Sequence, residues 1–245
     1  MSPVDSVSHT NRWRGKPLAE KAALAFGMLL LALVLPPFPG GIVVAAVMAA
    51  AALIGARVPP RIWLGFVAAP AGFLTVGALM LLVQVDTSGV RLAPEGVWTA
   101  AGLVVRSFAA VTCLVFLALT TPVTDLLAGA RRLGIPADVT EIALLMYRFV
   151  FTLTDTARSM DAAQAARLGH VGFRRRLRSL GSLIANLLPR AFEKARRLEV
   201  GLAARGWNGE LRVLTRPASA TARGMAQVLA IETAVGLFAW GVKLL

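Results

Sequence analysis

The chain has 245 residues, of which 57% are hydrophobic and 16% are charged, and its mean hydropathy is +0.69. Soluble domains usually have about 45–50% apolar and about 25% charged residues, so this composition excludes an ordinary soluble domain and indicates a membrane protein. On a soluble chain the net charge of +13 would suggest nucleic-acid binding. The basic stretch lacks the aromatic interleaving that stacks on bases, which disfavours a nucleic-acid partner.

Two apolar runs follow a polar start. Residues 1–17 are polar and basic, so we predict a short cytoplasmic tail. The runs at 22–35 and 42–56 are separated by a segment rich in Pro and Gly where a signal peptide would have its cleavage site, and a helical hairpin is therefore predicted. Because the first run is short for a bilayer core of about 30 Å, we expect its helix to begin at Leu18, with Lys21 snorkelling to the interface.

Three further apolar runs complete the predicted bundle, at 62–85, 97–119 and 226–242. Pro70 is expected to kink the first of these, since membrane helices tolerate Pro. Arg106 and Glu232 lie inside the other two, and charged residues within spans usually face the bundle interior. For both we favour a structural ion pair or a snorkelling side chain over a polar element in a moving interface. The sequence thus predicts an all-α polytopic membrane bundle with about five spans.

The region between Arg131 and Arg223 is basic, with 17 Arg or Lys and 7 Asp or Glu, a net charge of +10. The positive-inside rule places such a region in the cytoplasm. Apolar residues recur there every three or four positions, which predicts long amphipathic helices from Ala137 to about Arg167 and from Phe173 to about Arg205, the second bent at Pro189. Each helix would be about 45 Å long. Their apolar stripes must pack on each other, on the bundle, on anionic lipid or on a docked protein.

The two predicted helices end alike, in Ala165-Ala166-Arg167-Leu168-Gly169 and in Ala203-Ala204-Arg205-Gly206, with the two arginines 38 residues apart. Small residues permit close approach of another backbone, Gly supplies a helix C-cap, and the planar guanidinium can grip a carboxylate with two hydrogen bonds. One copy is a weak signal, because Ala222-Arg223-Gly224 repeats the letters beside the last apolar run. The informative observation is that two copies of this motif each close a long predicted amphipathic helix.

This arrangement resembles the transmembrane (T) component of energy-coupling-factor (ECF) transporters, most closely the CbiQ branch that is associated with cobalt and nickel uptake. The likeness covers most of the chain and is strongest between Pro122 and Gly209. It includes Arg131–Pro136, Leu145–Phe149 and Glu199–Trp207. The first helix end departs slightly from the family pattern, because Leu168 stands where Gly often follows the Arg.

The resemblance implies an all-helical fold with a membrane bundle and long cytoplasmic coupling helices. It also implies that two Ala-Arg motifs insert into grooves of two cytoplasmic ATP-binding subunits. Arg167 and Arg205 would then be the contacts, with Ala166, Ala204 and Gly206 permitting close approach. A separate membrane substrate-binding (S) subunit would carry the metal site, and ATP-driven movement of the coupling helices would reshape that subunit. The chain would lie in the cell inner (plasma) membrane as a multi-pass protein, with its basic region in the cytoplasm.

The chain itself offers few groups for metal binding or catalysis. Cys113, His9 and His170 are far apart in sequence, so we predict no metal site, no cofactor and no disulfide. The chain lacks a G-x-x-x-x-G-K-[ST] loop and a cluster of catalytic side chains, so we predict that it is not an enzyme and that ATP hydrolysis belongs to a partner. A stand-alone secondary transporter is the alternative, although such proteins are typically built from internal repeats, which the apolar runs do not show.

Combining the residue patterns with the resemblance gives four segments. They are a cytoplasmic tail at 1–17, a four-span membrane bundle at 18–120, a cytoplasmic coupling-helix module at 121–217 and a final transmembrane helix at 218–245. The choice between cobalt and nickel stays open at this point, because it would reside mainly in the substrate-binding subunit.

Overall fold

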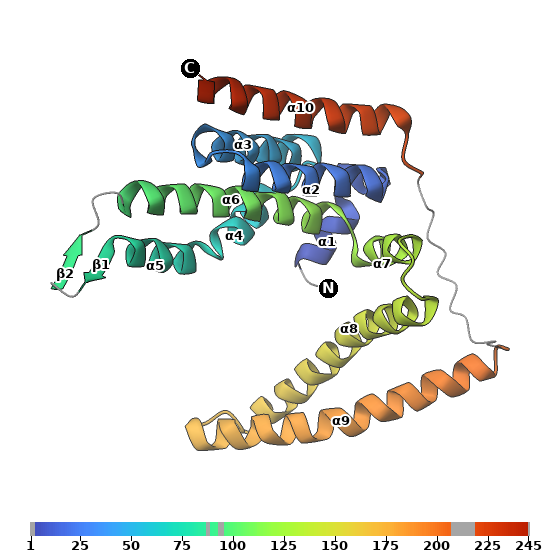
Figure 1. Cartoon of the computed structure of the whole chain (residues 1–245). Coiled ribbons are helices and arrows are strands. Elements are labelled where there is room, and N and C mark those ends of the chain that lie inside the picture. Colours follow the sequence, from blue (N-terminus) through green and yellow to red (C-terminus); the bar gives the residue numbers. More distant parts are fainter. Residues whose placement is uncertain (1–2, 87–88, 93–95, 207–218, 245) are drawn as a thin grey trace. The chain divides into compact units, whose positions relative to one another are not determined.

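The computed structural model describes residues 3–86, 89–92, 96–206 and 219–244 (Figure 1). The chain forms two compact units, of which the first comprises Met1–Gly129 with Arg216–Leu245 and the second comprises Ala130–Thr215. Trp207 and Gly209, at the end of the motif region quoted above, lie outside the described residues.

The first unit holds the apolar helices. Its elements are α1 (Pro3–Thr10), η1 (Arg12–Gly15), α2 (Leu18–Val34), η2 (Pro37–Gly41), α3 (Ile42–Ala50), η3 (Ala51–Gly55), α4 (Pro60–Ala68), α5 (Ala71–Leu81), β1 (Val83–Asp86), β2 (Gly89–Leu92), α6 (Gly96–Thr120), most of α7 (Val123–Arg132), and α10 (Ala222–Leu244). The predicted all-α polytopic membrane fold is confirmed.

Four helical stretches in the described residues are long and apolar enough to cross a membrane: Pro37–Gly55, Pro60–Leu81, Gly96–Thr120 and Ala222–Val242. The fifth predicted span, α2, has 17 residues and is therefore about 26 Å long, shorter than a bilayer core of about 30 Å. It begins at Leu18, as predicted. It ends at Val34 because the following prolines cannot continue a helix.

Two local features interrupt the helices of the first unit. Pro70 separates α4 from α5, so the predicted kink is confirmed as a break between two helices. Beyond α5, strands β1 and β2 form an antiparallel hairpin in which Val83 pairs with Leu92 (Figure 1). The sequence prediction did not include this hairpin.

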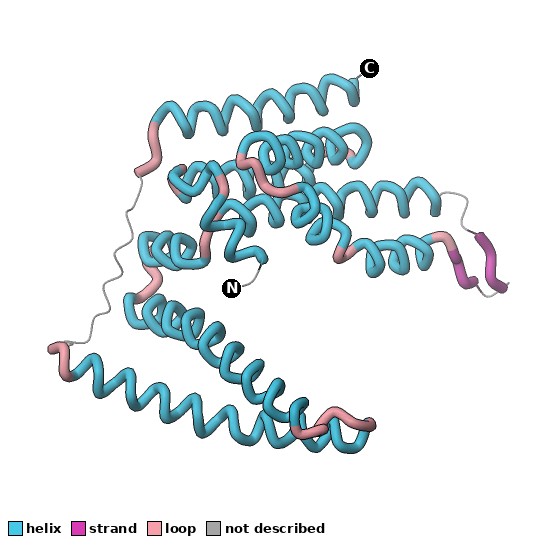
Figure 2. The backbone as a smooth tube through the Cα atoms, turned by 180° about the vertical axis from the view of Figure 1, so that it is seen from behind, coloured by secondary structure: helices cyan, strands magenta, loops and turns pink. Residues whose placement is uncertain are grey.

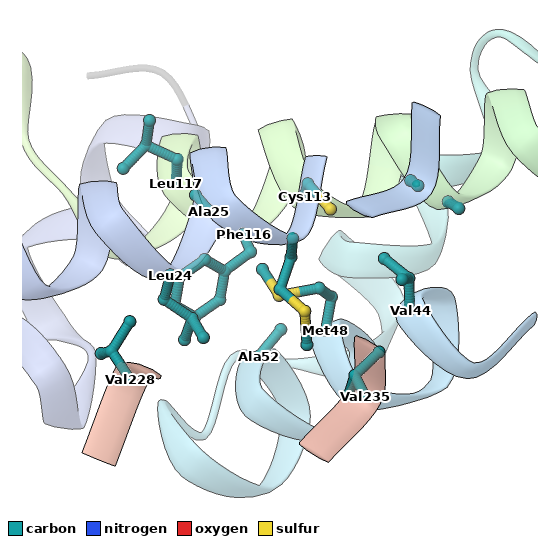
Figure 3. Packing of buried hydrophobic residues seen from close by; sticks show 13 residues of the cluster. Leu24, Ala25, Val44, Met48, Ala52, Cys113, Phe116, Leu117, Val228 and Val235 are labelled. Atoms are coloured by element: carbon teal, nitrogen blue, oxygen red, sulfur yellow. The ribbon is translucent and has the colours of Figure 1, made fainter. Parts of the chain in front are cut away.

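The core of the first unit lies where α2, α3, α6 and α10 pack together (Figure 3). Met28 of α2, Met48 of α3 and Phe116 of α6 have no exposed surface. Val228 and Val235 bring α10 into the same cluster, although more than a hundred residues separate α10 from α6. The last helix of the chain is therefore part of the bundle core.

The second unit contains two long helices joined by a short turn (Figure 2). Helix α8 runs from Ala137 to Ala166 and helix α9 from Phe173 to Ala203. These bounds agree with the predicted ones to within two residues, because the apolar spacing is long and regular. Pro189 lies inside α9 without ending it. The turn is fastened by a hydrogen bond of 3.0 Å that the Ser179 hydroxyl donates to the carbonyl of Gly169.

Candidate partner-docking site

The end of α8 is closed by a tight pair of backbone hydrogen bonds. The N–H of Gly169 donates to the carbonyl of Gln164 at 2.9 Å, and the N–H of Leu168 donates to that of Ala165 at 3.0 Å. This is the Schellman pattern, which normally places Gly in the left-handed conformation at the helix end. Here Leu168 adopts that conformation, with φ of 60°. The helix end therefore forms as the sequence predicted, but with a strained residue immediately after Arg167.

The end of α9 is similar in outline. Ala204 donates its N–H to the carbonyl of Val200 at 3.0 Å, and Gly206 donates to that of Ala203 at 3.0 Å. Gly206 has φ of +70°, a conformation that costs Gly nothing and costs other residues about 1–2 kcal/mol. The predicted Gly cap is thus confirmed for α9.

The side chains at both ends are open to solvent. Ala166 and Arg167 are exposed at the end of α8, as are Ala204, Arg205 and Gly206 at the end of α9. Within the described part of the chain, no ion pair is formed by Arg167 or Arg205, whereas Arg158 pairs with Asp155 and Arg197 with Glu193. Two guanidinium groups are therefore available to a partner.

The structure does not bring the two arginines together. Arg167 lies just before the start of α9 and Arg205 just after its end. Since α9 has 31 residues, about 46 Å of helix separates them. The end of α8 and the end of α9 therefore lie far apart, with the whole length of α9 between them (Figure 1).

Between α8 and α9 lies an open groove of about 500 Å³. Its lining is mainly apolar, with a charged edge. The lining residues are Val150, Leu153, Thr154, Ala157, Arg158, Asp161, Leu183 and Leu187. The apolar stripes of α8 and α9 face each other only in part, and this leaves a groove between the two amphipathic helices.

Potential metal-binding side chains do not gather in the described residues. No three of His, Cys, Asp and Glu lie together there. His9 is 3.6 Å from Asp5 and His170 is 3.1 Å from Asp161, each pair by itself. Cys113 is buried in the apolar core.

The two charged residues inside the predicted spans have separate roles. The guanidinium of Arg106 donates a hydrogen bond of 3.1 Å to the carbonyl of Leu35, at the end of α2. Glu232 of α10 instead lies against Gly27 of α2, where an added Cβ would be 2.1 Å from its Oε1. Arg106 thus caps the end of α2, and the structure records no ion pair between Arg106 and Glu232.

The prediction made for Lys21 is wrong. This lysine was predicted to snorkel to the interface, but only 1% of its surface is exposed. Its Nζ donates a hydrogen bond of 3.0 Å to the carbonyl of Thr120, at the end of α6. A buried ammonium needs such a partner, and a helix C-terminus favours positive charge. This contact joins residues 99 apart, so periodicity along the chain could not predict it.

The fold and the exposed helix ends define a multi-pass helical membrane protein with two long amphipathic helices that are suited to docking a partner. The chain matches the family model of the cobalt transport protein CbiQ over residues 10–215. The cobalt transport protein CbiQ of Rhodobacter capsulatus is 50% identical over 235 residues, which are 96% of each chain. The CbiQ protein of Salmonella typhimurium is 28% identical over 223 residues, which are 86% of this chain and 99% of that protein.

A third relative differs in its name. A putative ABC transporter ATP-binding protein of Bifidobacterium longum is 35% identical over 152 residues, which are 54% of this chain and 19% of that protein.

The match to the CbiQ family model and to the Rhodobacter protein covers most of this chain and shows that the chain belongs to the CbiQ family of cobalt transport proteins. It is accordingly a membrane component of a transporter rather than an enzyme.

Proposed function

We propose that the chain is the transmembrane coupling subunit of an ECF-type ABC transporter for cobalt uptake. In this function it transmits ATP-driven movement from two cytoplasmic ATP-binding subunits to a membrane substrate-binding subunit. Arg167 and Arg205 make the contacts to the ATP-binding subunits, and the small residues Ala166, Ala204 and Gly206 let the partner's groove close around each helix end.

The observation that carries this proposal is the pair of exposed arginines, Arg167 at the end of α8 and Arg205 at the end of α9, neither of which forms an ion pair within the described residues. With about 46 Å of helix between them, the two ends favour two docking sites on two subunits over one shared groove. A guanidinium paired with a carboxylate in a dry groove is expensive to remove, at about 2–5 kcal/mol. The relative named as an ABC transporter ATP-binding protein supports a partner of that class.

The metal would be held by the substrate-binding subunit. The described residues of this chain place no cluster of metal-ligating side chains together, which supports a division of labour between binding and coupling. Cobalt is favoured over nickel because the family and the two named relatives are cobalt transport proteins.

The proposed orientation follows from charge. The coupling-helix module, 121–217, lies in the cytoplasm, with the tail 1–17 on the same side. The bundle at 18–120 and the final helix at 218–245 lie in the cell inner membrane. This arrangement puts both helix ends where ATP is available.

Reconstitution into liposomes tests the proposal. We expect radioactive cobalt to enter vesicles that contain the chain, its ATP-binding subunits and its substrate-binding subunit, and only when ATP is supplied on the side of the ATP-binding subunits. Vesicles that contain the chain alone should take up no cobalt under any ion gradient. Gradient-driven uptake by the chain alone would contradict the proposal and identify a stand-alone secondary transporter.

A further inference from the structure

The corner between α6 and α7 is held by the beginning of the chain. The last carbonyls of a helix have no partner within it. At the end of α6, Lys21 donates a hydrogen bond of 3.0 Å to the carbonyl of Thr120. The side-chain amide of Asn11, whose shorter hydrogen bonds go to Val7 and Ser8, lies 3.3 Å from the carbonyl of Leu119 and 3.4 Å from that of Thr120. Leu119, Thr120 and Thr121 are almost completely buried. The corner is therefore fixed by donors from the N-terminal segment.

Helix α7 touches the same segment at two further points. The guanidinium Nη1 of Arg14 lies 2.5 Å from Oδ2 of Asp125, in the first turn of α7. One turn further on, Gly129 packs against Leu18, so closely that an added Cβ would be 2.1 Å from Leu18 Cδ2. The first two turns of α7 thus rest on η1 and on the start of α2.

The η1 turn that carries Arg14 is attached to the bundle by its neighbouring residues. Its neighbour Trp13 packs edge-to-face on Phe116 of α6, with ring centroids 5.6 Å apart. One residue earlier, the N–H of Arg12 donates to the carbonyl of Ala56 at 3.1 Å. The η1 turn is therefore bound to the bundle at the two residues that precede Arg14, and Asp125 is held to the bundle through this turn.

Helix α7 is also the stretch of chain that leads into the second unit, whose first residue is Ala130. A displacement that starts in α8 and travels along the backbone reaches α7 before it reaches α6. The Arg14–Asp125 pair is partly exposed, with 39% and 20% of the two side chains accessible. Asn11 and Lys21 also hold the end of α6 from buried positions, so the corner has hydrogen-bond donors besides this ion pair.

We propose that the Arg14–Asp125 ion pair is a positioning contact through which movement of the α8–α9 helices reaches the membrane bundle, so that its loss uncouples ATP hydrolysis from cobalt uptake. This inference rests on the proposed function. It assigns a coupling role to residues outside the two arginine helix ends.

The test uses the complete transporter complex in liposomes and measures cobalt taken up per ATP hydrolysed. The variants are Asp125→Asn, Arg14→Gln and the charge exchange Arg14→Asp/Asp125→Arg. Arg12→Gln is the matched control, because Arg12 is an exposed arginine of the same turn and forms no ion pair within the described residues. Thermal stability and the amount of bound ATP-binding subunit are measured for each variant.

Coupling mutations typically change coupling energies by about 0.5–2 kcal/mol, so Asp125→Asn and Arg14→Gln should each lower cobalt uptake per ATP by at least about twofold. Bound ATP-binding subunit and thermal stability should stay at wild-type levels, the charge exchange should restore the ratio, and Arg12→Gln should match wild type. An unchanged ratio would overturn the inference, as would a parallel loss of hydrolysis, uptake and stability. Absence of ATP-binding subunits from the wild-type complex would instead overturn the proposed function.

Discussion

Single backbone positions distinguish the two helix ends. Gly206 has φ of +70° after Arg205, and Leu168 has φ of 60° after Arg167. The left-handed conformation suits Gly and strains a side chain with a Cβ, and a β-branched residue most of all. The two ends should therefore respond in opposite directions to exchange of Gly and larger residues.

We expect Gly206→Val to destabilise the end of α9 by about 1–2 kcal/mol and to weaken binding of the ATP-binding subunit, because Val cannot relax in this conformation. Leu168→Gly should leave binding intact and raise thermal stability slightly. Thermal unfolding in detergent and co-purification of the partner measure both effects. Equal responses from the two variants would show that these caps do not set the position of the arginines.

A close approach inside the bundle gives a second prediction. Gly27→Val introduces side-chain atoms where the Glu232 carboxyl now lies. Because that carboxyl ends a flexible side chain that can move aside, we expect a loss of about 1 kcal/mol in stability, at the low end for overpacking, measured as a lower unfolding temperature. Adding Glu232→Ala should recover much of that loss. Gly236→Ala is the control, since its Cβ would meet Leu31 Cδ2 at an ordinary 3.7 Å. Failure of the second substitution to rescue stability would place the strain elsewhere.

At the scale of elements, patterns that repeat along the chain were predictable. The bounds of α8 and α9 follow from thirty-residue apolar periodicities, and the break at Pro70 follows from its missing N–H. Contacts between distant segments were not predictable. Lys21 was expected at the interface because the sequence shows its apolar neighbours but not the carbonyl of Thr120, which the fold brings to it.

The residues of the candidate site also differ in whether the sequence could predict them. The sequence predicts Arg167 and Arg205 as docking residues because each closes a recognisable helix. The structure confirms the two helix ends and leaves both side chains exposed, and the docking role stays a prediction. The Arg14–Asp125 contact joins residues 111 apart and carries no motif, so no local pattern could reveal it. Helix-end residues are thus readable from one sequence, while tertiary ion pairs require the fold.

The first turns of α9 contain an unusual charge pattern. Arg174, Arg175, Arg176 and Arg178 are all exposed, and this end of the helix has no acidic residue in its first turn. Positive charge is unfavourable near a helix N-terminus, at about 0.3–1 kcal/mol for each group. None of the four forms an ion pair within the described residues, so a contribution to the stability of α9 does not explain why these arginines lie there.

We expect these four arginines to strengthen docking at the neighbouring Arg167 end by electrostatic attraction. Replacing all four by Gln should weaken binding of the ATP-binding subunit at low salt and flatten its salt dependence, because exposed charges act over a screening length of about 10 Å at 0.1 M salt. Arg190→Gln/Lys194→Gln, on the same helix, is the control. An unchanged salt dependence would contradict this role.

For the whole molecule, the charge distribution predicts one orientation in the membrane. Cys113 is buried, so a single introduced cysteine can be labelled against a low background. A membrane-impermeant maleimide should label Arg175→Cys in inside-out vesicles and Asp86→Cys in right-side-out cells. The basic region is expected inside, and the segment 86–96, which has one Arg and two acidic residues, is expected outside. The reverse pattern would place the arginine helix ends away from ATP.

The central claim is that the two arginine ends attach this membrane chain to ATP-binding subunits. The most direct measurement is co-purification of an ATP-binding subunit with the chain, in detergent, from its native membrane. Arg167→Glu/Arg205→Glu should lower the bound subunit by about tenfold or more without loss of membrane insertion, whereas Arg148→Glu/Arg190→Glu, with the same charge change on the same two helices, should retain it. A chain that purifies without an ATP-binding subunit, or a double variant that binds it as well as wild type does, would contradict the account.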